Sequence, residues 1–326
     1  MKINLTLLVS LILHSNAYAN IDDEGPFDKQ GFSGEISLLT GISGGKSNFN
    51  IEKKIKNGEL NSAGESDSEF IAMPLGQMTY TFGKQKVFLG TAREDIVEGV
   101  LAFELGYAFA IGEESALSFS YLPAIASDET WKDPYLLNST RKKTDVSGNA
   151  YRVQYQNILN VGIDADFAYY DKDIDDELSG SSLTSNQELL KRSGDGYIFK
   201  LSAGLPLSQS TFITPSLGYS QFSADGDAMS FDQYNMGLTL MHSIGNHTFA
   251  LNGDYSKADY DAENPIFGKT QENTSYGFNL MYEYSNFMGW KNVGFNVVAG
   301  YEDTDSNINF YDEESYMLGM GMTYLF

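Results

Sequence analysis

The last eleven residues, Tyr316–Phe326, read YMLGMGMTYLF and show the pattern that decides the fold. Bulky apolar or aromatic side chains occupy alternate positions, with Gly and Thr at most of the positions between them. A β-strand sends successive side chains to opposite faces, so this alternation predicts a strand with one apolar face and one small or polar face. Strands of about ten residues with an apolar outer face are typical of barrels that span outer membranes.

The same alternation recurs upstream, in Phe249–Tyr255, Tyr276–Tyr284 and Phe295–Tyr301. Ten further segments of comparable pattern lie near residues 31–42, 69–82, 86–93, 99–110, 115–126, 146–157, 161–170, 195–205, 211–222 and 231–243. Short connections alternate with longer loops between them, which predicts an all-β, antiparallel up-and-down barrel of fourteen strands with both termini periplasmic. Twelve strands is the alternative, because residues 69–93 are irregular and Pro74 interrupts them.

The N-terminal residues 1–19 have the layout of a secretory signal peptide. Lys2 supplies the positive charge, Leu5–Leu13 a short apolar run, and Ala17-Tyr18-Ala19 a cleavage site after Ala19. The run is too short for a membrane-spanning helix, which needs about 20 residues. We expect residues 20–30 to form a short periplasmic segment and residues 31–326 a single barrel domain in the bacterial outer membrane.

Composition excludes several classes of protein. The chain has 44 acidic against 21 basic residues, a net charge of −23, which argues against a nucleic-acid partner. It has no Cys, and its 21 Tyr and 21 Phe argue against disorder. Aromatic residues concentrate where a membrane meets water, and nine lie near predicted strand ends: Tyr107, Phe109, Tyr155, Tyr169, Tyr219, Tyr255, Tyr284, Tyr301 and Tyr324. A soluble β-sandwich would have shorter strands. The terminal Phe326 resembles the signal by which the barrel-assembly machinery recognises its substrates.

The inward positions of the predicted strands carry charged side chains. The pore-lining candidates are Glu35, Glu104, Arg152, Asp164, Asp166, Lys200, Asp254, Glu283 and Glu302. In one interpretation they line a narrow, water-filled pore that favours cations, with Arg152 and Lys200 set against Asp164 and Asp166. In the other they form structural ion pairs inside a plugged lumen. The sequence leaves both open.

We expect no enzyme and no cofactor. His242 and His247 flank a predicted turn, and no G-x-S-x-G motif is present. Five residues, Asp303, Asp305, Asn307, Asn309 and Glu314, have EF-hand-like spacing and form a weak Ca²⁺ candidate. Position 6 of that loop is Ile308 instead of Gly, so the pattern favours a strand with a wet face, and no metal site is predicted.

The loops suggest contacts at the cell surface. Glu129–Tyr135 and Asn264–Gly268 combine aromatics with Pro, which suits compact packed loops or binding tips. The basic run Arg141-Lys142-Lys143 could pair with lipopolysaccharide phosphates, although such runs are usually solvated loop faces. Outer-membrane lipid and lipopolysaccharide are the expected partners. Whether residues 127–145 and 171–194 fold inward across the pore decides how open the lumen is.

The sequence predicts a porin-like channel for passive diffusion of small polar or cationic solutes. The alternative is a structural or surface-interaction barrel with an occluded lumen and adhesin-like or receptor-like loops. Transport of hydrophobic compounds is a third possibility, which would need a lateral opening or an N-terminal plug.

Six stretches also resemble a known family: GFSGEISL (Gly31–Leu38), ETWKDPY (Glu129–Tyr135), KTDVSGNAYR (Lys143–Arg152), DYDAENPIFGKT (Asp259–Thr270), YEYSNFMGW (Tyr282–Trp290) and DTDSNINFYDEE (Asp303–Glu314). Together they resemble an uncharacterised family of Gram-negative outer-membrane proteins that is catalogued only as a domain of unknown function. The resemblance covers essentially the whole mature chain. It implies an outer-membrane location and a single domain, and it brings no activity, substrate or catalytic residue.

Overall fold

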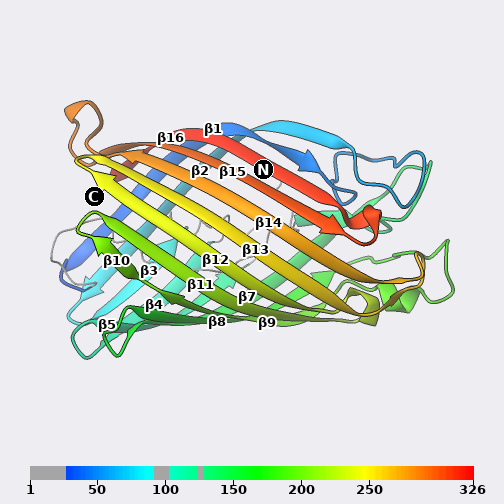
Figure 1. Ribbon diagram of the computed structural model, residues 1–326, viewed down its shortest axis with the longest axis horizontal. Helices are drawn as coiled ribbons and strands as arrows, with labels where there is room; N and C mark the ends of the chain where they lie inside the picture. Colours follow the sequence, from blue (N-terminus) through cyan, green and yellow to red (C-terminus); the bar gives the residue numbers. More distant parts are fainter. Residues whose placement is uncertain (1–26, 92–102, 124–127) are drawn as a thin grey trace.

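The computed structural model describes residues 27–91, 103–123 and 128–326. These residues form one antiparallel sheet that closes on itself as a barrel (Figure 1). Closure comes from the pairing of the first strand, β1 (Gly31–Lys46), with the last, β16 (Glu313–Leu325), over twelve residue pairs. An antiparallel barrel with this strand order is the fold that the alternation predicts.

Fourteen strands make the wall. The remaining bounds are β2 (Ser66–Phe82), β3 (Gln85–Gly90), β4 (Glu104–Ile111), β5 (Ser115–Pro123), β6 (Asp128–Trp131), β7 (Lys143–Ile158), β8 (Ile163–Ile174), β9 (Gly194–Ala203), β10 (Leu205–Ser208), β11 (Thr211–Ala224), β12 (Phe231–Ile244), β13 (His247–Asn264), β14 (Lys269–Tyr284) and β15 (Val293–Ser306). β6 prolongs the pairing of β5 on β7, and β10 prolongs that of β9 on β11. Fourteen strands are thus confirmed, and the twelve-strand alternative is wrong: Pro74 lies within β2, facing outward, without ending it.

The two ends of the barrel differ. At one end tight connections join the strands, such as Gly83–Lys84 and Gly245–Asn246, and both Gly31 and Phe326 lie there. At the other end the connections are long and include the short 3₁₀ segments η2 (Gln187–Leu190), η3 (Asp227–Met229) and η5 (Asn309–Tyr311). A fourth such segment, η4 (Phe287–Gly289), lies in the longest connection of the short-turn end. Several strands continue further toward the long loops than predicted, as β1 does to Lys46 and β8 to Ile174.

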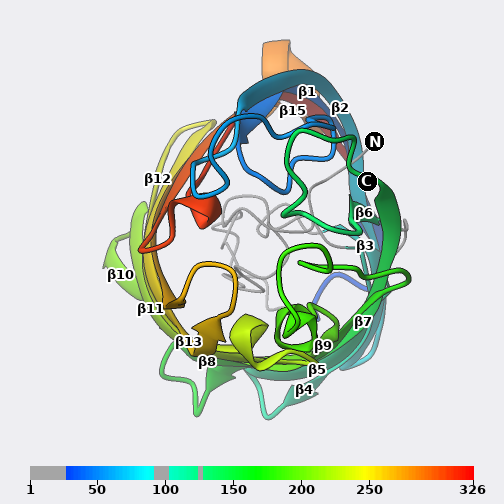
Figure 2. The ribbon, with the colours of Figure 1, turned by 90° about the vertical axis from the view of Figure 1, so that its right-hand side faces the viewer.

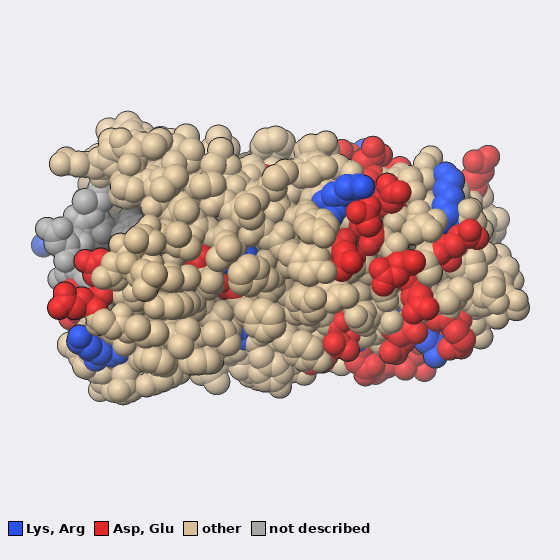
Figure 3. Space-filling model, turned by 60° about the horizontal axis from the view of Figure 1, so that its bottom comes forward, with Lys and Arg blue, Asp and Glu red and all other residues tan. Residues whose placement is uncertain are grey.

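The outer face of the barrel is apolar across its middle. Leu38, Phe119, Leu251 and Met320 are between 47 and 58 % exposed although each lies in a strand. The space-filling view shows a wide band with few charged side chains, and most Asp and Glu gather toward the long loops (Figure 3). Such a band is what a hydrocarbon layer covers.

Tyrosines mark one edge of that band. Tyr121, Tyr151, Tyr169 and Tyr197 are direct cross-strand neighbours on β5, β7, β8 and β9. Tyr219 continues the row, with its ring centroid 6.0 Å from that of Tyr197. A ring of tyrosines beside an apolar band is the expected girdle at the membrane–water boundary.

Only some of the predictions for the N-terminal region fall on residues that the structure describes. The signal peptide and its cleavage after Ala19 lie outside the described residues, as do residues 20–26 of the predicted periplasmic segment. Phe27 is buried against the inward-facing Ala108 and Ala116, so the chain leaves the inside of the barrel just before β1 begins. No helix in the described part of the chain is long and apolar enough to span a membrane.

The apolar band predicts an unequal response to the same substitution at two exposed leucines. Leu251 on β13 is 48 % exposed and Leu183 in the β8–β9 loop is 49 % exposed. In lipid, Leu251→Arg should cost about 2–4 kcal/mol of unfolding free energy, whereas Leu183→Arg should cost under about 0.5 kcal/mol. Guanidinium unfolding of the barrel in phospholipid vesicles measures both. Equal costs would show that Leu251 does not face lipid.

Candidate pore

All nine pore-lining candidates lie on the inner face of the barrel. Their strand neighbours, such as Leu105, Tyr151 and Phe199, are outward and exposed, and alternation turns the candidates inward. Glu104, Arg152, Asp166 and Lys200 are buried; Glu35, Asp164, Asp254, Glu283 and Glu302 are partly exposed. Both basic side chains are therefore buried, and every partly exposed member of the set is a carboxylate.

Four of these residues form a charged row across neighbouring strands: Glu104 (β4), Arg152 (β7), Asp166 (β8) and Lys200 (β9). The Arg152 Nε donates to both carboxylate oxygens of Asp166 at 3.0 Å, and its Nη1 lies 4.0 Å from Glu104 Oε1. Ser120 donates to Glu104, and Lys200 is the cross-strand partner of Asp166. A buried guanidinium with two carboxylates is held by its partners, because breaking such a pair leaves an uncompensated buried charge.

The partly exposed carboxylates are distributed along the barrel. Asp164, whose Oδ1 accepts from the Asn157 backbone N–H at 2.7 Å, lines a small cavity with Lys200 and Ser202. Asp254 and Glu302 are both cross-strand partners of Gly277, so they flank one glycine on β14. A Cβ at Gly277 would collide with the Asp254 carboxylate, which lies across it. Glu35 and Glu283 lie nearer the short-turn end.

An apolar patch was not expected on the inner wall. Leu39, Met73, Leu75 and Val298 are all less than 9 % exposed and pack together. The patch lies on β15, β1 and β2; in a ring of fourteen strands, seven steps lead to the opposite side, so these strands face β7, β9 and β11. The apolar patch therefore lies opposite the charged row, and the lumen has two unlike walls.

The second unexpected feature is an aromatic row on the inner wall, made of Tyr170, Phe222, Phe231 and Tyr260. Successive ring centroids are 5.9, 5.8 and 5.2 Å apart. Tyr170 and Phe222 stack at an interplanar angle of 3° across Gly196, where a Cβ would approach the Tyr170 ring to 2.8 Å. Adjacent apolar pairs, such as Tyr169-Tyr170 or Leu38-Leu39, are the signal that could have revealed inward apolar side chains.

The long loops fold inward and pack over the barrel mouth (Figure 2). Their core, the loop cap, is made of residues from four connections: Tyr135, Leu190, Ala228, Met229, Ile308, Phe310 and Tyr311. Phe310 and Ile308 are 0 % exposed, and the Tyr135 and Tyr311 hydroxyls lie 2.7 Å apart. The Asn264 side chain donates to Tyr311 at 2.8 Å, which ties the β13–β14 loop to the cap.

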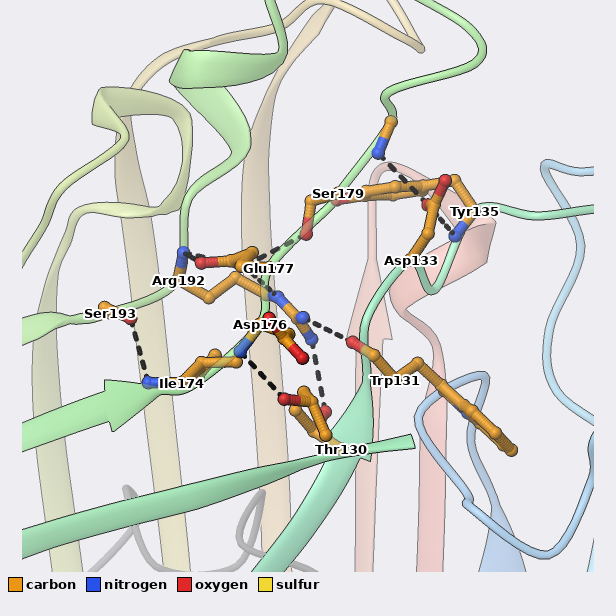
Figure 4. Close-up of polar contacts among 12 residues, drawn as sticks. Thr130, Trp131, Asp133, Tyr135, Ile174, Asp176, Glu177, Ser179, Arg192 and Ser193 are labelled. Atoms are coloured by element: carbon orange, nitrogen blue, oxygen red, sulfur yellow. Dashed lines mark hydrogen bonds and ion pairs between the residues drawn. The ribbon is translucent and has the colours of Figure 1, made fainter. Parts of the chain in front are cut away.

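Buried ionic contacts hold the cap together (Figure 4). The Arg192 Nε donates to Glu177 Oε1 at 2.6 Å, and its Nη2 donates to the Trp131 carbonyl at 2.6 Å. Asp133 accepts from the backbone N–H groups of Tyr135 and Gly180 at 3.0 and 3.1 Å. These bonds join the β6–β7 connection (residues 132–142) to the β8–β9 loop (residues 175–193), so the two loops cross the mouth together.

The expectation of a solvated basic run is wrong for Arg141. Arg141 is 4 % exposed, donates to the Asn48 carbonyl at 2.7 Å, and stacks over the Trp131 ring at 4.5 Å. Burial lowers its pKa to about 10. Lys142 is exposed, and Lys143 lies 3.4 Å from Glu129. Trp131 and Tyr135 are 0 % exposed, so the Glu129–Tyr135 segment is a packed loop and not a binding tip.

The remaining candidates occupy ordinary polar positions. His242 Nδ1 and His247 Nδ1 are hydrogen-bonded to the Thr211 and Tyr282 hydroxyls at 2.8 and 2.9 Å, at the short-turn end. Of the weak Ca²⁺ candidates, Asp303, Asp305, Asn307 and Asn309 are exposed and Glu314 is half-buried. The Asn307 side chain bonds the β13–β14 hairpin, and Glu314 pairs with Lys46 at 2.6 Å. Within the described residues no group of three or more His, Asp or Glu side chains could hold a metal ion.

The closed wall, apolar band and polar interior define a transmembrane β-barrel of the outer-membrane class. The chain belongs to a family described as a protein of unknown function (DUF2860), whose model matches residues 31–325. This confirms the resemblance seen in the sequence. Among curated protein sequences, none matches the chain.

Several solved structures are similar to this chain at low sequence identity. The outer-membrane channel DcaP of Acinetobacter baumannii is 10 % identical with a TM-score of 0.46, over 93 % of this chain and 99 % of that one. Pseudomonas aeruginosa OpdQ is 10 % identical with a TM-score of 0.40, over 91 % and 100 %. An anion-selective porin from Comamonas acidovorans is 10 % identical with a TM-score of 0.42, over 90 % and 100 %. Similarity at this level says nothing about the solute or the ion selectivity of this chain. Both have to be argued from the geometry of the chain itself.

The loop cap should loosen at alkaline pH. Burial raises the pKa of the Tyr135 hydroxyl to about 12, above its ordinary value of 10. Since the packed cap holds this proton more tightly than the open loop, cap stability is full below pH 10. It then falls by about 1.4 kcal/mol per pH unit until about pH 12.

Trp131 reports this change, because it is 0 % exposed and Trp290 is the only other tryptophan. In a Trp290→Phe background, acrylamide quenching of Trp131 should rise between pH 10 and 12. Adding Tyr135→Phe removes this ionising group and should reduce the rise, while the buried Tyr311 hydroxyl, whose pKa burial also raises, accounts for the remainder. An identical rise in both proteins would assign it to another group.

Proposed function

We propose that this protein is a porin-like channel for passive diffusion of small polar solutes, with a preference for cations. The observation that carries the proposal is the unequal burial of the inner charges. Arg152 and Lys200 are 2 and 3 % exposed, while Asp164, Asp254 and Glu302 keep part of their surface exposed inside the barrel. A diffusing ion would therefore meet a surplus of negative charge, which lowers the energy of a cation and raises that of an anion.

The loop cap supports a restriction on solute size. Loops that cross the mouth and pack to 0 % exposure at Phe310 leave less room than the barrel wall alone encloses. Barrels of about fourteen strands lie between small barrels filled by side chains and wide porins. We propose that small solutes pass and larger ones are excluded.

The same cap favours a second candidate function. A barrel whose loops form one packed body could present that body to the surroundings as a structural or surface-interaction module with an occluded lumen. The observation that supports this second function is the packing of Tyr135, Leu190 and Phe310, which come from three separate loops. Ion conductance separates the two candidates.

The proposal includes an orientation, partners and the absence of catalysis. We propose that the short-turn end and both termini are periplasmic, that the long loops face outward beside lipopolysaccharide, and that Phe326 is read by the barrel-assembly machinery. The proposal is of a non-enzymatic protein, with small solutes as its ligands and no cofactor.

Neutralising the partly exposed carboxylates should weaken cation preference. In planar bilayers under a KCl gradient, the double variant Asp164→Asn, Asp254→Asn should lower the K⁺-to-Cl⁻ permeability ratio by about twofold to threefold. The amides keep the size of the side chains, and the amide oxygen introduced at position 164 can still accept the bond from the Asn157 backbone N–H. The reversal potential measures the change.

A matched control is Asp303→Asn, at an exposed carboxylate on the outer face of β15. It removes one carboxylate charge outside the lumen, against two inside in the double variant, and should leave the reversal potential where it was. A correctly folded protein that conducts no ions would favour the occluded barrel. Equal shifts in both proteins would contradict the assignment of the inner carboxylates to the path.

A further inference from the structure

The aromatic row occupies a defined level of the inner wall. Tyr170, Phe222, Phe231 and Tyr260 lie in one cross-strand register on β8, β11, β12 and β13, with Gly196 of β9 between the first two. The next level toward the short turns holds Ala168, Ile198, Ser220 and Ala258, and the one after it holds Asp166 and Lys200. Side chains on one face recur every two residues, so the charged level lies about 13 Å from the aromatic row.

Part of the row remains open to a ligand. Tyr170 and Tyr260 are partly exposed, while Phe222 and Phe231 are 5 and 8 % exposed and support them from between. Within the described residues, the buried Tyr170 hydroxyl has no hydrogen-bond partner. A buried hydroxyl without a partner costs stability, so the ring is placed for a reason other than its own hydrogen bonding.

The row already holds an ammonium group. Lys172, two residues beyond Tyr170 on the same face of β8, places its Nζ over the Phe222 ring, 5.9 Å from the centroid. Ring faces attract cations through their quadrupole, and the attraction grows when water is excluded. Lys172 repels a second cation at Phe222, so the ring faces left for an ammonium nitrogen with apolar substituents are those of the partly exposed Tyr170 and Tyr260.

From this we infer that the aromatic row is a binding subsite for organic ammonium ions that carry apolar groups, lying between the loop cap and the inner carboxylates. The inference rests on the proposed channel function and names its solute class. The partly exposed rings of Tyr170 and Tyr260 contact the cation and its apolar groups, and the partly exposed Asp164 and Asp254 receive it further along. A metal cation such as K⁺ lacks the apolar groups and gains less from the row.

Block of the K⁺ current tests the subsite. Benzyltrimethylammonium, added on the side of the long loops, should reduce the K⁺ current of the reconstituted full-length barrel. Its half-blocking concentration should be about tenfold below that of methylammonium, which has the charge without the large apolar body. Benzoate and benzyl alcohol, with the ring and without the positive charge, should block weakly.

Two substitutions at one position separate the ring from the hydroxyl. Tyr170→Phe keeps the ring and loses only the unpartnered hydroxyl, so its half-blocking concentration should match that of the unchanged protein. Tyr170→Leu removes the π face and should raise the value about threefold to tenfold. Phe199→Leu, on the lipid-facing side of β9, is the matched control and should leave block unchanged. Each value is referred to the K⁺ current of the same variant.

The outcomes distinguish the subsite from the channel. Absence of K⁺ current in the folded protein would overturn the channel itself. A K⁺ current blocked equally by benzyltrimethylammonium and methylammonium, or equally by benzoate, would overturn the subsite and leave the channel standing. Loss of block in Phe199→Leu as well as in Tyr170→Leu would also overturn it, because the effect would not be local to the aromatic row.

Discussion

The structure depends on backbone hydrogen bonding in a medium without water. Each unpaired N–H or C=O in lipid costs several kcal/mol, so a sheet that crosses a membrane must close on itself. The seam between β1 and β16 provides that closure, and Gly34 and Phe326 exchange both backbone hydrogen bonds there at 3.0 Å. The seam is tight: a Cβ at Gly41 would lie 2.6 Å from the Gly319 Cα opposite. Small residues at the last strand therefore serve the fold as much as its aromatic face does.

Closure separates the side chains into two environments, and burial then sorts the charges within the lumen. Alternate residues face lipid and must be apolar, while those between them face a lumen where charges are tolerated only when paired or wet. Arg152 is engaged by Asp166 and lies near Glu104, which leaves Asp254 and Glu302, on more distant strands, as carboxylates with accessible surface. The electrostatic character of the inner wall therefore depends on which charged side chains are paired, as well as on how many acidic and basic side chains face the lumen.

How much the sequence predicts follows from the range of the interactions involved. Alternation is local, so the strands, the girdle tyrosines and the inward carboxylates were predictable from segments such as Tyr316–Phe326. Inward apolar side chains such as Leu39 and Phe222 were missed. The rule that side chains on the inner face are polar or small predicts no bulky apolar residues there. The loop cap was beyond prediction, since Tyr135 and Tyr311 meet across 176 residues of sequence and neither segment has a periodic pattern.

The same unequal burial of charged side chains gives a structural explanation for the excess of acidic residues. All three arginines in the described part of the chain, Arg141, Arg152 and Arg192, are less than 9 % exposed, and each joins separate segments through several hydrogen bonds. A guanidinium offers five donors in a planar fork, so it can satisfy several carbonyls or carboxylates at once in a buried position. Because these scarce cations are used inside as ties, much of the net charge of −23 stays on accessible carboxylates. The proposed preference for cations is then a consequence of how the loops and the wall are held together.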